Sequence, residues 1–339
     1  MANESVNYQC PACGGPLHFS SAEQKLACDY CDSRFEVAEV EALYRERQAK
    51  ADAKADAAPT PAQTASPSEA EMLGQNAGYI CSSCGAELIS DGTVAVTTCP
   101  YCGNPAVAPG QLSGSFSPDL VIPFKLERKD ALSALQEHYK GKILLPKSFI
   151  SGNHIDEVQG VYVPFWLYGA HADGEVHFDA ENHRVTEYPD RTVTTISHYD
   201  AYRKGNMSFE RVPVDGSTKM PDGHMDAIEP FDYSSLRPFS VAYMPGFIAN
   251  RYDEDSSVCR DRAEKRMEGS LISAFRQTVS SYNTASLISQ NLDYDWEDAD
   301  YALFPVWMLS TSWNGKNYLF AMNGQTGRMV GELPCSKPK

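Results

Sequence analysis

The chain has 339 residues, a formal net charge of −16 and a hydrophobic content of 42%. This length accommodates about two to three domains with cores of their own, and the acidic balance argues against a protein whose main task is to neutralise phosphates. Eight of the ten cysteines fall into two quartets. That usage fits thiolates holding metal in a reducing compartment better than a secreted disulfide framework. We therefore expect a cytoplasmic protein.

The start of the chain has neither the basic nor the apolar region of a signal peptide, so none is expected. The least polar stretch, residues 158–172, is interrupted by glycines and by Pro164. It is also shorter than a membrane-spanning helix requires. The sequence as such predicts a soluble chain.

Two Cys-x2-Cys pairs with fourteen residues between them open the chain. Zinc takes four soft ligands tetrahedrally, and a short turn between two cysteines puts both sulfurs on one side of the metal. The spacing predicts a zinc ribbon of two short hairpins over residues 1–35. Its ligands would be Cys10, Cys13, Cys28 and Cys31. A helix is expected over 36–56, followed by a flexible linker over 57–77, whose Ala, Pro, Ser and Thr cannot form a core.

The same spacing recurs 71 positions later, which predicts a second ribbon over residues 78–110. Its ligands would be Cys81, Cys84, Cys99 and Cys102. Each quartet is complete and leaves no open coordination position, so we expect two structural zinc ions rather than a catalytic one. Iron in a rubredoxin-like redox site is the alternative metal, and chance register or disulfides are the alternatives without metal.

The second ribbon has no Lys or Arg between residues 79 and 110, only Glu87 and Asp91 as charged residues. Nucleic-acid affinity rests largely on such basic residues. Nucleic acid is therefore a disfavoured partner, and a protein partner is expected instead.

Residues 117–334 read as an α+β domain with mainly antiparallel sheet, followed by a tail at 335–339. An internal duplication is predicted because Val163–Leu167 recurs as Phe304–Met308. Each copy is followed by a hairpin signal, first Asp173-Gly174 and then Asn314-Gly315. Each hairpin follows an expected helix, near 129–139 and 257–279.

Other groups are weaker candidates. His171, His177 and His183 would share a strand face only if the strand ran unbroken through the predicted turn. The acidic run 293–300 lacks the glycine and the final glutamate of a calcium loop. Cys259 lies beside two arginines but has no identifiable base. Trp166 and Trp307 are expected in the strand core. No nucleotide-binding or hydrolase motif is present.

The knuckles Cys-Pro-x-Cys-Gly and Cys-Pro-Tyr-Cys-Gly, with Val-Pro-Phe-Trp-Leu and the closing motif over residues 320–334, resemble a bacterial family. Its members are labelled TFIIB-type zinc ribbon-containing proteins and are often tagged as primosomal replication-restart helicases. The resemblance implies zinc at the eight cysteines. It does not carry the helicase label, because no motor motif is present. Members of that family continue into membrane-spanning helices, so the chain is either a soluble member or a cytoplasmic portion at the membrane.

Three functions remain open at this point. The first is a non-enzymatic scaffold that uses tandem zinc ribbons to bind a protein partner, and the absence of a catalytic constellation favours it. The second is a zinc ribbon factor associated with nucleic acid in transcription or replication. The third is an enzyme whose site forms in the C-terminal domain from residues far apart in the sequence.

Overall fold

The computed structural model describes residues 3–4, 8–55, 77–80, 87–90, 94–98, 105–107, 117–152 and 158–335. The chain is an α+β protein with mainly antiparallel strands and divides into two compact units. The first unit combines residues 1–165, 215–253 and 301–339, and the second combines 166–214 and 254–300. Strand β10 (Gln159–Tyr188) begins in the first unit and continues in the second.

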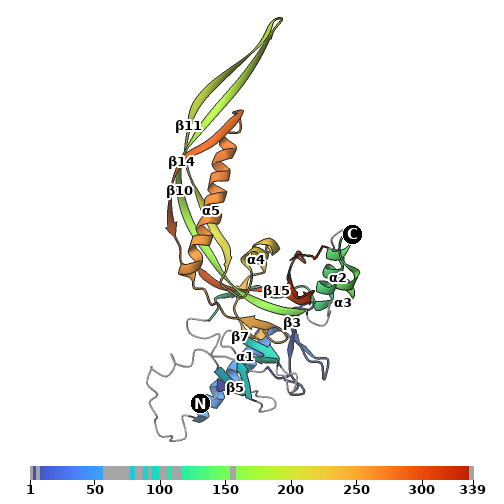
Figure 1. The fold of residues 1–339 in the computed structure, drawn as a ribbon. Helices are drawn as coiled ribbons and strands as arrows, with labels where there is room; N and C mark the ends of the chain where they lie inside the picture. The colour runs from blue at the N-terminus through green and yellow to red at the C-terminus, as the bar shows by residue number, and fades with distance from the viewer. Residues whose placement is uncertain are drawn as a thin grey trace. The chain divides into compact units, whose positions relative to one another are not determined.

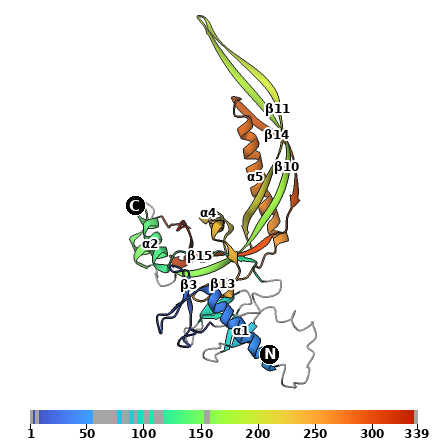
Figure 2. The ribbon, with the colours of Figure 1, turned by 180° about the vertical axis from the view of Figure 1, so that it is seen from behind.

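The N-terminal part of the first unit is a small sheet followed by a helix. The strands β2 (His18–Ser20), β3 (Lys25–Ala27) and β4 (Arg34–Phe35) form an antiparallel sheet in that order. Helix α1 (Val37–Ala55) follows at once, where the sequence predicts a helix (Figure 2). A small core joins these elements to the segment 241–247. Its buried members are Tyr8, Cys10, Leu17, Phe19, Leu26, Cys28, Val37, Val40 and Ala242.

The segment of the second cysteine quartet contributes two antiparallel strand pairs. Strand β5 (Ala77–Ile80) pairs with β6 (Glu87–Ser90), and β7 (Val94–Thr98) pairs with β8 (Pro105–Val107). Strand β5 also pairs in parallel with β1 (Asn3–Glu4). The quartet itself, Cys81, Cys84, Cys99 and Cys102, lies outside the described residues.

The larger sheet of the first unit mixes parallel and antiparallel pairs. Its order is β12-β9-β15-β10-β13-β7-β8, and β16 and β17 extend it from β15. Besides β7, β8 and β10, whose bounds are given above, its strands are β9 (Leu120–Val121), β12 (Arg237–Pro238), β13 (Ile248–Asn250), β15 (Asp300–Trp313), β16 (Lys316–Asn323) and β17 (Met329–Gly331). The helices of this unit are α2 (Arg128–Tyr139), α3 (Lys147–Gly152) and α4 (Asp222–Ile228), with the 3-10 turns Tyr233–Ser235 and Val241–Tyr243.

Aromatic side chains fill the centre of this sheet. The ring of Phe124 stacks on Phe247 with centroids 4.1 Å apart, and Phe165 stacks on Phe304 at 4.6 Å. Both Trp166 and Trp307 are buried. The use of tryptophan as strand core, expected from the sequence, therefore agrees with the structure.

The second unit is one long helix lying on three strands. Figures 1 and 2 show α5 (Ser256–Thr278) running along β10, β11 (Arg191–Asp215) and β14 (Thr284–Trp296). Every second residue of β10 from Ala172 to Ala180 is buried. These residues form a core with the face of α5 that carries Leu271, Ile272 and Phe275.

The hairpin predicted at Asp173-Gly174 is wrong, because β10 continues unbroken from Gln159 to Tyr188 and turns at Pro189-Asp190. Gly174 serves a different purpose. A Cβ built on it would lie 2.9 Å from Phe275 Cε2 and 3.1 Å from Leu271 Cδ2, both on α5. The glycine lets the helix approach the strand closely, a use that a local turn signal does not reveal.

The second predicted hairpin turn is confirmed. Strand β15 ends at Trp313 and β16 begins at Lys316. Asn314 has φ 50° and Gly315 has φ 73°, so both turn residues are left-handed, as a two-residue hairpin turn of this type requires. Only the second of the two hairpin signals forms a turn, so the turns do not support the proposed duplication.

Candidate metal centre

Four cysteine thiols, two from buried and two from exposed residues, converge beside the small N-terminal sheet. The Sγ atoms of Cys10, Cys13, Cys28 and Cys31 all lie within 4.8 Å of one another. Two of the separations are 3.6 Å, between Cys10 and Cys31, and 3.5 Å, between Cys13 and Cys28. Sulfurs bound tetrahedrally to zinc at about 2.3 Å would be about 3.8 Å apart. The thiols are therefore spaced as one tetrahedral metal ion requires.

Both cysteine pairs sit in turns of the same construction. In the first, Gly14 N–H donates to the Cys10 carbonyl at 2.8 Å and Cys10 N–H donates to the Gly15 carbonyl at 2.6 Å. In the second, Asp32 N–H donates to the Cys28 carbonyl at 3.0 Å and Cys28 N–H to the Ser33 carbonyl at 3.1 Å. The bonds close each turn and hold its two thiols on the same side.

The residue after each pair adopts the left-handed conformation. Gly14 has φ 76° and Asp32 has φ 55°. Glycine adopts this conformation without strain, and aspartate is among the side chains that tolerate it best. The sequence pattern Cys-x2-Cys followed by Gly or Asp thus has a backbone cause.

Each of the two exposed thiols has a polar neighbour. Gly15 N–H donates to Cys13 Sγ at 3.4 Å, and Cys31 Sγ lies 3.2 Å from the Ser33 hydroxyl. Hydrogen bonding by the hydroxyl and the backbone of Ser33 lowers the pKa of the Cys31 thiol to about 6. The Ser33 contacts favour the thiolate form of Cys31, which is the form that binds metal. For Cys13 the Gly15 N–H acts in the same direction, but hydrogen bonds with the Cys31 and Cys28 thiols outweigh it and raise the Cys13 pKa to about 12.

The cluster rests on the first unit through both its core and its backbone. Cys10 and Cys28 are buried in the core shared with segment 241–247. Phe19 N–H donates to the Pro245 carbonyl at 3.0 Å, and the Phe19 ring meets the Tyr243 ring edge-on at 5.3 Å. Gln24 Nε2 donates to the Phe124 carbonyl at 2.7 Å. The sequence gives no local signal for these contacts, because the two partners of each contact are 100 or more residues apart.

His171, His177 and His183 lie on β10, which is unbroken from Gln159 to Tyr188. The sequence analysis expects them to share a strand face only in that case. Each has a partner of its own. His171 Nδ1 lies 3.1 Å from the Ser208 hydroxyl, His177 Nδ1 lies 3.0 Å from Asp200 Oδ1, and His183 Nε2 lies 2.8 Å from Glu181 Oε2. Among the described residues, only the four-cysteine group brings three or more metal-binding side chains together.

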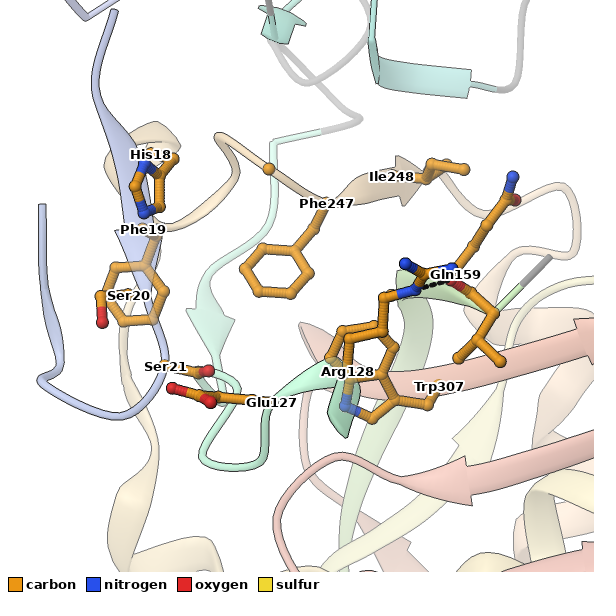
Figure 3. Close-up of a pocket in the computed structure, with 13 residues that line it drawn as sticks. His18, Phe19, Ser20, Ser21, Glu127, Arg128, Gln159, Phe247, Ile248 and Trp307 are labelled. Atoms are coloured by element: carbon orange, nitrogen blue, oxygen red, sulfur yellow. Dashed lines mark hydrogen bonds between the residues drawn. The ribbon is translucent and has the colours of Figure 1, made fainter. Parts of the chain in front are cut away.

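The remaining candidates are structural in position. Cys259 is buried on α5. Of the acidic run, Asp293 and Asp295 belong to β14 and face solvent. Trp307 lines a cavity of about 470 Å³ together with His18, Glu127 and Arg128 (Figure 3). The sequence does not predict this cavity, because its walls come from segments far apart in the chain.

In the part of the chain that the structure describes, no helix combines the length and apolarity needed to cross a membrane.

No family model matches the chain, and no solved structure matches it. One relative is the Bacillus subtilis (strain 168) protein named "Uncharacterized protein YdjG". It is 31% identical over 334 residues, a match that covers 98% of this chain and 92% of the relative. The chain therefore belongs to the family of Bacillus subtilis YdjG.

Proposed function

We propose that the four thiolates of Cys10, Cys13, Cys28 and Cys31 hold one structural zinc ion in a rubredoxin-like ribbon. The observation that carries this proposal is the mutual distance of their sulfurs, all within 4.8 Å. Four protein ligands fill a tetrahedral site and leave no position for water or substrate. A module of this size builds only a small core, and the metal would supply the stability that the core lacks.

The second cysteine quartet holds a second zinc ion in the same proposal. Strands β5 and β6 flank the Cys81/Cys84 pair, and β7 and β8 flank the Cys99/Cys102 pair. Shifted by 71 residues, these strands fall on the segments that flank the first quartet, including β2, β3 and β4. The strand positions support a repeated module, as does the resemblance to TFIIB-type zinc ribbon proteins.

The protein as a whole is proposed to be a non-enzymatic scaffold that binds a protein partner in the cytoplasm. Its closed metal sites offer no catalytic position, and thiolate zinc sites fit a reducing compartment. The second module lacks Lys and Arg from residue 79 to residue 110, which opposes phosphate binding. A nucleic-acid factor would instead show binding that weakens steeply with salt.

Metal content tests the zinc proposal. Native mass spectrometry of protein purified without added metal should show two zinc ions per chain. The Cys13→Ser variant should retain one, and the matched control Cys335→Ser, an exposed cysteine outside both quartets, should retain two. Iron in place of zinc, or an unchanged metal count in Cys13→Ser, would refute the assignment.

Partner capture tests the scaffold proposal separately. Intact protein and a Cys81→Ser/Cys84→Ser variant would be immobilised and exposed to a bacterial lysate, and the bound proteins compared by quantitative mass spectrometry. A set of proteins enriched only on the intact protein supports the proposal. Equal recovery on both surfaces contradicts it, whatever the metal content.

A further inference from the structure

Among the described residues, strand β11 has one open edge. It runs for 25 residues, and among the strands in the described part of the chain it pairs with β10 alone. An unpaired strand edge of this length presents a row of backbone N–H and C=O groups to any strand that fits beside it.

The outer part of the β10–β11 hairpin lacks the support that its base has. The pairing of β10 with β14 ends where Glu181 meets Thr284, and the core under α5 ends at Ala180 and Ala201. Both views show the two strands continuing past the end of α5 (Figures 1 and 2). Its large exposed apolar residues are Val185, Tyr188, Val193 and Ile196. A two-stranded hairpin is marginally stable in water, and a third strand would stabilise it.

The face of β11 that points away from α5 carries charges in an ordered pattern. Lys204 pairs with Glu175 on β10, and Asp200 lies 3.0 Å from His177 Nδ1 on β10. Between these two charges stands Tyr202, which is 45% exposed. Asp200, Tyr202 and Lys204 thus form a row of acid, ring and base along one face of the open edge.

We propose that β11 pairs antiparallel with β11 of a second copy of this chain, about a two-fold axis at Tyr202. Opposite residues of such a pair lie on the same face, so Asp200 of each copy stands opposite Lys204 of the other. Across the joined sheet the charges then alternate in sign: Glu175, Lys204 and Asp200 of the second copy. On the face toward α5, Tyr199 stands opposite Gly205 of the second copy, a pairing in which an aromatic ring covers a glycine.

The charges also favour this register over the others near it. An axis at Ala201 would place Asp200 opposite Tyr202 and Lys204 opposite His198, so it would lose both acid–base pairs. A two-fold axis at Asp200, Arg203 or Lys204 would place two like charges directly opposite one another, which is destabilising. With the axis at Tyr202, no two like charges are opposite between residues 194 and 210. The strand complements itself, which is why the proposed occupant is a second copy rather than a foreign strand. The inference goes beyond the proposed function and does not depend on the metal.

Cysteine cross-linking tests the register directly. In a Cys335→Ser background, Tyr202→Cys places two thiols opposite each other, with Cβ atoms about 4.5–5.5 Å apart, close enough for a disulfide after a small shift. The control Asn206→Cys lies on the same face of the same strand, but its two copies would be about 26 Å apart, eight residues along the strand. Mild oxidation should give a covalent dimer for Tyr202→Cys and none for Asn206→Cys. Equal cross-linking of both, or of neither, would overturn the proposal.

Charge reversal tests the contact in solution. Sedimentation equilibrium should show a dimer for the wild-type chain. Lys204→Asp places two acids opposite each other twice and should weaken the dimer about tenfold or more. Asp200→Lys/Lys204→Asp restores opposite signs and should restore dimerisation, which separates the interface from any loss of the contact with Glu175. Circular dichroism verifies that each variant is folded. A monomeric wild-type chain, or a double variant no tighter than the single one, would contradict the pairing.

Discussion

The side chain of Asn323 ties two loops of the first unit together. Its Nδ2 donates to the carbonyls of Ile228 and Pro230 at 3.0 and 3.2 Å. Its Oδ1 accepts from the backbone N–H of Gln325 at 2.9 Å and of Thr326 at 3.1 Å. The residue is fully buried. Each of these hydrogen bonds therefore takes the place of a hydrogen bond that the same group makes to water in the unfolded chain. These bonds hold the turn that Asn323-Gly324-Gln325-Thr326-Gly327 forms.

Replacing Asn323 by Ala should therefore destabilise the first unit. The change leaves two carbonyls and two N–H groups of the buried loops without partners, at a cost of about 1–3 kcal/mol. Urea unfolding followed by intrinsic fluorescence measures it. Gln136→Ala, an exposed amide on α2 of the same unit, is the matched control and should lie within about 0.5 kcal/mol of wild type. Similar stability of the two variants would exclude the proposed role of the amide.

Asp232 gives the same region a dependence on pH. Hydrogen bonding from the Ser234 hydroxyl, then the contact with Lys125, lowers the pKa of the Asp232 carboxyl from 3.8 to about 2. A depressed folded-state pKa contributes stability above the unfolded value, and that contribution disappears as the pH falls through the folded value. The difference in unfolding free energy between wild type and Asp232→Asn should therefore be constant above about pH 5 and should shrink between about pH 4 and pH 2. A difference that does not change with pH would show that the carboxylate charge contributes nothing.

At the scale of elements, α5 is held on its strands by close packing and by a capped start. Asp255 Oδ1 accepts from the backbone N–H of Ser257 at 2.9 Å and of Val258 at 3.1 Å, as an N-cap residue does. Farther along, the helix meets β10 at Gly174. Helix and strand thus determine each other's positions through residues about a hundred positions apart.

Adding one methyl group at this contact should separate the two elements. Gly174→Ala brings a Cβ within 2.9 Å of the Phe275 ring, and overpacking of this kind costs about 1–3 kcal/mol. Gly269→Ala on α5, where a Cβ would meet nothing within 4 Å, should instead stabilise the helix by about 0.5–1 kcal/mol. Thermal unfolding, followed by circular dichroism at 222 nm, compares the stability of the two variants. The account fails if both substitutions change the stability in the same direction.

The elements also show what local sequence can and cannot predict. Asn314-Gly315 forms the expected turn because two left-handed residues between strands are sufficient for it. Asp173-Gly174 carries an equally strong local signal but lies inside β10, because burial of the alternate residues against α5 outweighs it. Helices α1, α2 and α5 occur where the sequence analysis expects helices. Turn signals therefore fail where a distant element decides the outcome.

At the scale of the whole molecule, the cysteine spacing predicts the convergence of the first quartet because the chemistry is local to two short turns. The attachment of that module is different. Its core includes Ala242 and its backbone bonds to Pro245, partners that no spacing rule connects with residues 8–35. The two compact units are likewise interleaved along the chain. Dividing the sequence into consecutive domains cannot detect such interleaving.

Removal of metal should affect the two units differently. The first unit contains the four-cysteine module, so prolonged treatment with a zinc chelator should lower its unfolding temperature and expose Tyr8, which is buried in the module core. The core of α5, β10, β11 and β14 contains no proposed ligand and should keep its hydrogen-exchange protection. Hydrogen exchange measured with and without chelator shows the effect on each unit separately. Equal loss of protection in both units would contradict a structural role confined to the first.

X-ray absorption at the zinc edge tests the central claim most directly. The account predicts zinc surrounded by four sulfur atoms at about 2.3 Å with no nitrogen or oxygen in the inner shell, as the convergence of Cys10, Cys13, Cys28 and Cys31 requires. Any nitrogen or oxygen ligand, or a spectrum of iron in place of zinc, would contradict two closed structural zinc sites.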